Sequence, residues 1–167
     1  MKEALEKALN FEKEGFEFYK KIAAEMQNPL AKRLFESLAE QEKEHMKKIK
    51  EIYESLDFAA SSNQPATAAG IEEELKKIFF ELEESRRKMP LDHLEGYKLA
   101  MEMEKKGYNM YREFTQTAAS ESEKKFFEAL MQEEKEHLNS LDNVYRFLTD
   151  TPTWYSEEES RVWNWMV

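Results

Sequence analysis

The chain repeats part of its own sequence at a constant offset of 92 residues. The segment FESLAEQEKEHMKKIKEIYESL at 35–56 aligns without a gap to FEALMQEEKEHLNSLDNVYRFL at 127–148, and EKEGFEFY at 12–19 aligns at the same offset to EKKGYNMY at 104–111. A segment that repeats in this way is a structural unit that buries its apolar face against its copy. The sequence therefore predicts two related halves that pack together, with residues 57–91 as the crossover between them.

Helix-breaking residues divide the chain into helical segments. Four glycines and four prolines in 167 residues, with abundant Glu, Lys, Leu, Ala and Met, favour helix throughout. Breaks at Asn28-Pro29, 61–70, Met89-Pro90, Ser120 and Thr151-Pro152 predict helices at about 2–27, from 30 to about 60, at about 71–89, at 92–118 and at 122–149. Two helical hairpins joined by a long crossover make a four-helix bundle. We therefore expect an all-α fold, with this bundle in residues 1–150 and a crossover helix at about 71–89.

Residues 151–167 form a tail that is rich in tryptophan. Ser156, with Glu159 three residues later, has the spacing of a capping box and predicts a short C-terminal helix. Trp154, Trp163 and Trp165 are too many large aromatic residues for an exposed chain end. We therefore expect the tail to pack on the bundle or on the other subunit of a homodimer.

The apolar face of each long helix is interrupted at its centre by ionisable residues. The predicted buried faces are Leu5, Ala8, Glu12, Phe16, Tyr19 and Ala23; Leu34, Leu38, Glu42, His45, Ile49, Ile52 and Leu56; Ala100, Glu104, Tyr108, Tyr111 and Thr115; and Phe126, Leu130, Glu134, His137, Leu141, Tyr145 and Leu148. Residues three apart on a helix lie on the same side. The six ionisable residues, Glu12, Glu42, His45, Glu104, Glu134 and His137, should therefore converge at one level of the bundle.

Four buried carboxylates cannot all stay charged without partners. Each would lose several kcal/mol of hydration energy, and their mutual repulsion would raise their pKa values further. Two divalent cations would neutralise the four charges, and two imidazoles would supply one nitrogen to each ion. Oxygen-rich ligation with one nitrogen per ion suits iron or manganese, with zinc or cobalt as substitutes. The sequence therefore predicts a two-metal site.

The six interrupting residues resemble the di-iron motif of the ferritin-like superfamily, in which two helices each carry a Glu and two carry a Glu-x-x-His. Within that superfamily, residues 1–150 resemble the rubrerythrin family, whose A-x-x-x-E-x-x-x-x-x-x-Y pattern occurs at Ala8-Glu12-Tyr19 and at Ala100-Glu104-Tyr111. The resemblance implies a non-haem centre of two iron ions. It also implies that the protein reduces hydrogen peroxide or O₂ with electrons from an external donor such as a separate rubredoxin.

Two features depart from the family pattern. The chain has no cysteine and therefore no rubredoxin domain, which typical members carry after the bundle. Gly107 stands where typical members have a second glutamate that exchanges with a His ligand. Glycine also occupies the equivalent position of the first half, at Gly15. Two explanations stay open: free space beside the metals for a small oxidant, or close packing of the helices.

The other polar residues near the motif receive simpler interpretations. Tyr19 and Tyr111 lie on the buried faces, where a tyrosine hydroxyl needs a partner. We expect each to hydrogen-bond a ligand carboxylate from a facing helix and hold it in place, although plain packing is the alternative. Five glutamates fall outside the predicted stripes and are expected in solvent: Glu14, Glu40, Glu44, Glu133 and Glu136.

Charge and hydropathy exclude several kinds of partner. A net charge of −10 argues against nucleic-acid binding, which needs clustered Lys and Arg. No apolar run approaches the length of a membrane span, and no signal-peptide pattern is present, so we expect a cytoplasmic protein. Three functional classes remain: a di-iron oxidoreductase, a ferroxidase or iron-handling protein, and a structural bundle that metal holds together. The two-fold symmetry of the ligands favours the first.

Overall fold

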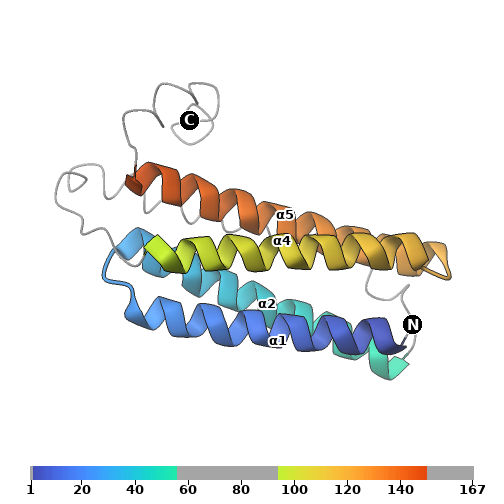
Figure 1. Cartoon of the computed structure of the whole chain (residues 1–167). Coiled ribbons are helices and arrows are strands. Elements are labelled where there is room, and N and C mark those ends of the chain that lie inside the picture. Colours follow the sequence, from blue (N-terminus) through green and yellow to red (C-terminus); the bar gives the residue numbers. More distant parts are fainter. Residues whose placement is uncertain (1, 56–93, 150–167) are drawn as a thin grey trace, which may run out of the picture.

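The computed structural model describes residues 2–55 and 94–149, which form four long helices. These are α1 (Lys2–Glu25), α2 (Pro29–Ser55), α4 (Leu94–Thr117) and α5 (Glu121–Thr149). They run side by side as two antiparallel hairpins, α1 with α2 and α4 with α5 (Figure 1). The predicted all-α four-helix bundle is confirmed. The crossover helix expected near 71–89, the C-terminal helix and the tryptophan-rich tail lie outside the described residues.

Each hairpin turn is short because a capping residue starts the second helix immediately. The side-chain oxygen of Asn28 accepts hydrogen bonds from the backbone N–H groups of Leu30 (3.0 Å) and Ala31 (3.1 Å). Pro29 occupies the first helical position, where no donor is needed. In the second hairpin, Ser120 Oγ accepts a hydrogen bond of 3.1 Å from the N–H of Glu123. The breakers seen in the sequence therefore end one helix and also cap the next.

The core consists of two apolar clusters separated along the bundle axis. One contains Leu34, Phe35, Leu38, Tyr97 and Leu141, and the other contains Leu5, Ile49, Ile52, Phe127 and Leu130. Burying one such side chain stabilises the fold by about 1.5–3 kcal/mol. Along α2, Glu42 and His45 come after the first cluster and before Ile49 of the second. The polar centre of the bundle is therefore closed off by apolar side chains at both ends.

The buried faces differ from the predicted stripes at a few positions. Gly15 and Gly107 are buried, whereas Phe16 and Tyr108, the next residues, are only half-buried on the flank of the helix. Near the end of α5, Val144 and Phe147 are buried in place of Tyr145 and Leu148. Each difference is a rotation by one residue, about 100° around the helix, between neighbouring positions that both satisfy the three-and-four spacing.

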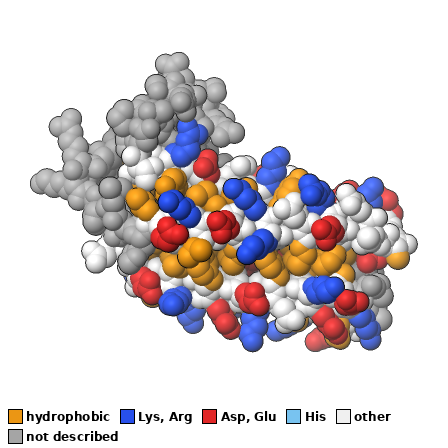
Figure 2. Space-filling view, in the orientation of Figure 1, with side chains coloured by type: hydrophobic (Ala, Val, Ile, Leu, Met, Phe, Trp, Pro, Cys, Tyr) orange, Lys and Arg blue, Asp and Glu red, His pale blue; other side chains and the backbone are white. Residues whose placement is uncertain are grey.

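The outer surface of the bundle is charged. Figure 2 shows Lys and Arg interspersed with Asp and Glu over one face, with a band of hydrophobic side chains running along it. None of the helices in the described ranges is long and apolar enough to cross a membrane.

Candidate metal centre

The structure brings all six predicted ligands together in the middle of the bundle. α1 supplies Glu12, α2 supplies Glu42 and His45, α4 supplies Glu104, and α5 supplies Glu134 and His137. Every one of them is buried, with at most 2% of its surface exposed. Each Glu-x-x-His places its two side chains one helical turn apart on the same face, so the four helices present their donors at one level.

The six residues form two overlapping clusters. One comprises Glu12, Glu42, His45 and Glu134, and the other comprises Glu42, Glu104, Glu134 and His137. Within each cluster, one ligand atom from each residue lies within 4.8 Å of the others. Glu42 and Glu134 belong to both clusters, and we call them the shared carboxylates. This geometry suits two ions, each with one histidine, one carboxylate of its own and the two shared carboxylates.

The two tyrosines fix the unshared carboxylates across the bundle. The hydroxyl of Tyr19, on α1, donates a hydrogen bond to Glu104 Oε1 on α4, and that of Tyr111, on α4, donates to Glu12 Oε1 on α1. This is the kind of partner that the sequence predicted. Burial first, and the nearby carboxylates next, raise the pKa of both hydroxyls well above the ordinary value. Both tyrosines therefore remain protonated and act as donors.

Several polar atoms of the centre have no hydrogen-bond partner within the described residues. They are Oε2 of Glu42, Oε2 of Glu104, both carboxylate oxygens of Glu134, and Nδ1 of His137. Buried groups of this kind normally find a partner, because an unsatisfied carboxylate costs several kcal/mol. All five atoms belong to the proposed ligand set, and carboxylate oxygens with one imidazole nitrogen per cluster suit iron or manganese. The donor set therefore fits two divalent cations.

Without cations, protons must balance the charge of the centre. Burial and the neighbouring Glu42 raise the pKa of Glu12 to about 8. Burial and Glu104 raise the pKa of Glu134 well above its ordinary value. Burial alone would lower the pKa of His137, but the surrounding carboxylates, Glu104 first, raise it to about 10. Metal ligation requires the deprotonated groups, so cations and protons compete for the same sites.

Both histidines direct Nδ1 into the centre and Nε2 out of it. His45 Nδ1 lies 3.0 Å from Glu12 Oε2, and His137 Nδ1 lies 3.4 Å from Glu42 Oε1. On the outer side, His45 Nε2 contacts the carboxylate of Glu133, and His137 Nε2 lies 2.7 Å from Gln41 Oε1. The two rings stack with their centroids 5.6 Å apart.

The expectation that Glu133 lies in solvent is wrong. The residue is 3% exposed, its carboxylate contacts the ring Nε2 of His45, and Lys48 Nζ lies 3.7 Å from its other oxygen. Position 133 is three residues after Leu130 and four before His137, so it satisfies the helical spacing as well as Glu134 does. Gln41, the equivalent residue of the first half, is also buried and was missed for the same reason. The other glutamates expected in solvent are exposed at Glu14, Glu40 and Glu44 and half-buried at Glu136.

Two of the buried glycines, Gly15 and Gly107, lie against the shared carboxylates. A Cβ atom on Gly107 would lie 2.7 Å from Phe11 Cε1 and 2.8 Å from Glu134 Oε2, and one on Gly15 would lie 3.4 Å from Glu42 Cδ. The idea that Gly107 leaves free space for an oxidant is therefore wrong. Close packing, the other explanation, is the one that the structure supports.

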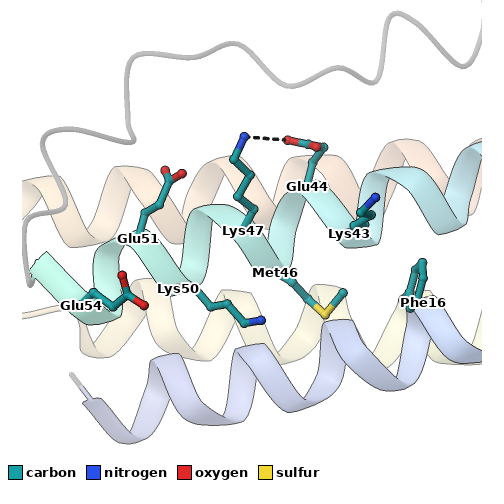
Figure 3. Close-up of a pocket in the computed structure, with 8 residues that line it drawn as sticks. All are labelled: Phe16, Lys43, Glu44, Met46, Lys47, Lys50, Glu51 and Glu54. Carbon is teal, nitrogen blue, oxygen red and sulfur yellow. Dashed lines mark ion pairs between the residues drawn. The ribbon is translucent and has the colours of Figure 1, made fainter.

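A separate groove of about 490 Å³ lies on the outer flank of α2 (Figure 3). It is lined by Phe16 of α1 and seven residues of α2: Lys43, Glu44, Met46, Lys47, Lys50, Glu51 and Glu54. Glu44 faces Lys47 there, in an ion pair of 4.0 Å between exposed side chains. Glu44 belongs to the same EKEH sequence as His45 but points away from the centre.

Comparison with known proteins agrees with this geometry. The family model described as Rubrerythrin matches residues 3–145, a range that includes all six candidate ligands and both tyrosines. Comparisons with curated proteins and with solved structures gave no match. Because the family model covers most of the chain, the protein belongs to the rubrerythrin family, within the ferritin-like superfamily.

Proposed function

We propose that the protein is a non-haem di-iron oxidoreductase that reduces hydrogen peroxide with electrons from a separate donor. The observation that carries the proposal is the pair of overlapping clusters, in which six buried donors share Glu42 and Glu134. Reduction of one peroxide to two waters consumes two electrons and two protons, and two ferrous ions bound here would supply one electron each. Four carboxylates also balance the charge of two divalent ions.

The chain's own residues contribute positioning and exclusion of water. Tyr19 and Tyr111 hold the unshared carboxylates, so these cannot rotate away from the centre when the charge on it changes. The apolar clusters at both ends of the centre keep bulk water out. The chain has no cysteine that could bind a further iron centre, so we propose that a separate protein such as a rubredoxin returns the electrons.

The test compares the two oxidants on the same ferrous protein. Metal-free protein is loaded with two Fe(II) per chain without oxygen and mixed rapidly with hydrogen peroxide or with O₂, and oxidation is followed by absorbance. We expect peroxide to be the faster oxidant and the reaction to stop after one cycle until an outside reductant is added. Glu134→Ala should abolish stoichiometric iron binding, whereas Glu44→Ala, which removes a carboxylate from the outer surface, should not.

Other results would favour the other functional classes. If O₂ oxidises the protein faster and many more than two irons per chain are retained, the protein is an iron-handling protein or ferroxidase. If two metals bind and neither oxidant reacts, the metals serve the stability of the bundle. A homodimer and a cytoplasmic location remain predictions from the sequence, and sedimentation analysis measures the first.

A further inference from the structure

The two histidines of the centre have chemically different partners on their outer nitrogens. His45 Nε2 contacts the carboxylate of Glu133, whereas His137 Nε2 contacts the amide oxygen of Gln41 at 2.7 Å. Positions 41 and 133 are equivalent in the repeat, one residue before each shared carboxylate. Both partners are buried, with 8% of Gln41 and 3% of Glu133 exposed. The ligand sets of the two halves match, but the groups behind the histidines carry different charges.

The difference extends one step further from the centre. Lys48 Nζ lies 3.7 Å from the second oxygen of Glu133, and its side chain is 18% exposed. The residue equivalent to Lys48 in the second half is Ser140, which is buried and uncharged. Behind His45 there is therefore an acidic group balanced by a lysine near the surface. Behind His137, the equivalent positions hold a neutral amide and a hydroxyl.

A carboxylate that accepts the outer N–H of a histidine makes the imidazole a stronger metal ligand. The ionised acceptor draws the ring proton toward itself and increases electron density on the opposite nitrogen, which is the one that faces the metal. An amide oxygen holds the ring in the same orientation without adding charge. We propose that Glu133 and Gln41 make the two metal positions inequivalent, so that the position beside His45 binds a divalent cation more tightly and fills first. The proposal rests on the two-metal centre of the proposed function.

Cobalt(II) is a suitable probe, because its binding is visible without any catalytic turnover. Metal-free protein is titrated with Co(II) at fixed pH and salt, and calorimetry and absorbance give the two stepwise affinities. With histidine labelled by nitrogen-15, the shifted ring N–H signals show which histidine receives the first ion. We expect the wild-type steps to differ by about 10–100-fold, the range over which outer partners of metal-binding histidines act. The signal of His45 should shift first.

Exchanging the two partners gives the decisive variants. Glu133→Gln should weaken the tighter step by about 10–100-fold and bring the two affinities together. Gln41→Glu should strengthen the weaker step, and the double variant should reverse the order, so that His137 fills first. Glu44→Gln is the matched control. Glu44 is the neighbour of His45 in the sequence and, like Glu133, its carboxylate lies close to a lysine, but it contacts Lys47 and not the imidazole ring. This variant should leave both steps unchanged.

The outcomes distinguish failure of the inequivalence from failure of the two-metal centre. If two Co(II) ions bind and the order and spacing of the steps are the same in wild type, Gln41→Glu and Glu133→Gln, the inequivalence is refuted while the two-metal centre stands. If wild-type protein does not bind two Co(II) per chain, the centre itself is refuted. Circular dichroism checks the fold of each metal-free variant. Should Glu133→Gln fail to fold, Gln41→Glu decides alone: merged steps support the proposal and unchanged steps overturn it.

Discussion

Replacing each of the two glycines beside the centre by alanine tests how closely the helices pack there. Gly15 and Gly107 occupy equivalent positions of the repeat, both inside helices and both facing a shared carboxylate. At Gly15 the added Cβ would make an ordinary contact, 3.4 Å from Glu42 Cδ. At Gly107 it would lie 2.7 Å from Phe11 Cε1 and 2.8 Å from Glu134 Oε2, which is closer than real Cβ contacts.

The expected magnitudes follow from these distances. Alanine inside a helix is more favourable than glycine by about 1 kcal/mol, so Gly15→Ala should raise the free energy of unfolding of the metal-free protein by up to that amount. At Gly107 the same gain is set against an overpacking cost of about 1–3 kcal/mol, so Gly107→Ala should be neutral or destabilising by up to about 2 kcal/mol. The two variants should therefore differ by about 1–3 kcal/mol.

Urea unfolding of the two metal-free variants, analysed with a common slope, measures this difference. A second assay is Co(II) binding, because the alanine at position 107 displaces Glu134, which belongs to both clusters. Gly107→Ala should weaken both binding steps, and Gly15→Ala should weaken neither by a comparable factor. If the two variants are equally stable and both bind metal like the wild type, the helices do not pack against Gly107 as closely as the structure shows.

Three further predictions concern the charge balance of the centre. Removing metal with a chelator should lower the melting temperature, because a ligand that binds only the folded state stabilises it. The stabilisation is about 2.7 kcal/mol when the free metal concentration is one hundred times its Kd. Equal melting curves with and without the chelator would count against a loaded core site. Tyr19→Phe and Tyr111→Phe should each cost about 1–3 kcal/mol in urea unfolding, since each leaves a buried glutamate oxygen without its hydrogen-bond donor. Tyr53→Phe, which removes an exposed hydrogen bond of 2.8 Å to Glu6, is the control and should cost less. In the metal-free protein the pKa is about 8 for Glu12 and about 10 for His137, so both hold protons at pH 7 and must lose them to bind metal. Metal affinity should therefore rise with pH between 6 and 8. Calorimetry in buffers of different ionisation enthalpy should show that binding releases more than one proton. A metal affinity that does not depend on pH would contradict the assigned protonation.

The parts of the centre that the sequence could predict are those that violate a regular pattern. A glutamate or histidine inside an apolar stripe is conspicuous, and the repeat shows the same violation twice, so Glu42 and Glu134 were identified together with their histidines. Glu133 violates no pattern, because in a chain so rich in glutamate a neighbour of the stripe looks like part of the solvated surface. Its burial depends on His45 reaching across from α2, which is a property of the packed bundle.

At two other positions, periodicity predicted burial of a residue that the structure leaves half-buried. Periodicity placed Phe16 and Tyr108 on the buried faces because large apolar residues are the usual occupants of such positions. The positions one residue earlier satisfy the spacing equally well, and the structure buries Gly15 and Gly107 there instead. At position 107 the reason is the carboxylate of Glu134, which lies so close to the backbone that a Cβ atom there would clash with it. The side chains that pack against the helix, and not the periodicity of the helix itself, therefore determine which residue is buried.

A duplicated centre also explains why its inner and outer parts differ in symmetry. A metal ligand is tightly specified, because replacing a shared carboxylate would remove a donor from both candidate metal positions at once. The six donors are identical in the two halves. The group behind a histidine is specified only as a hydrogen-bond acceptor, a requirement that a glutamate and a glutamine both satisfy. The two halves can therefore differ at positions 41 and 133 without loss of the fold or of either ring orientation. Because the substitution preserves geometry but changes charge, it alters the ligand strength of one histidine relative to the other, and an inequivalent pair of metal positions follows from a nearly symmetric frame.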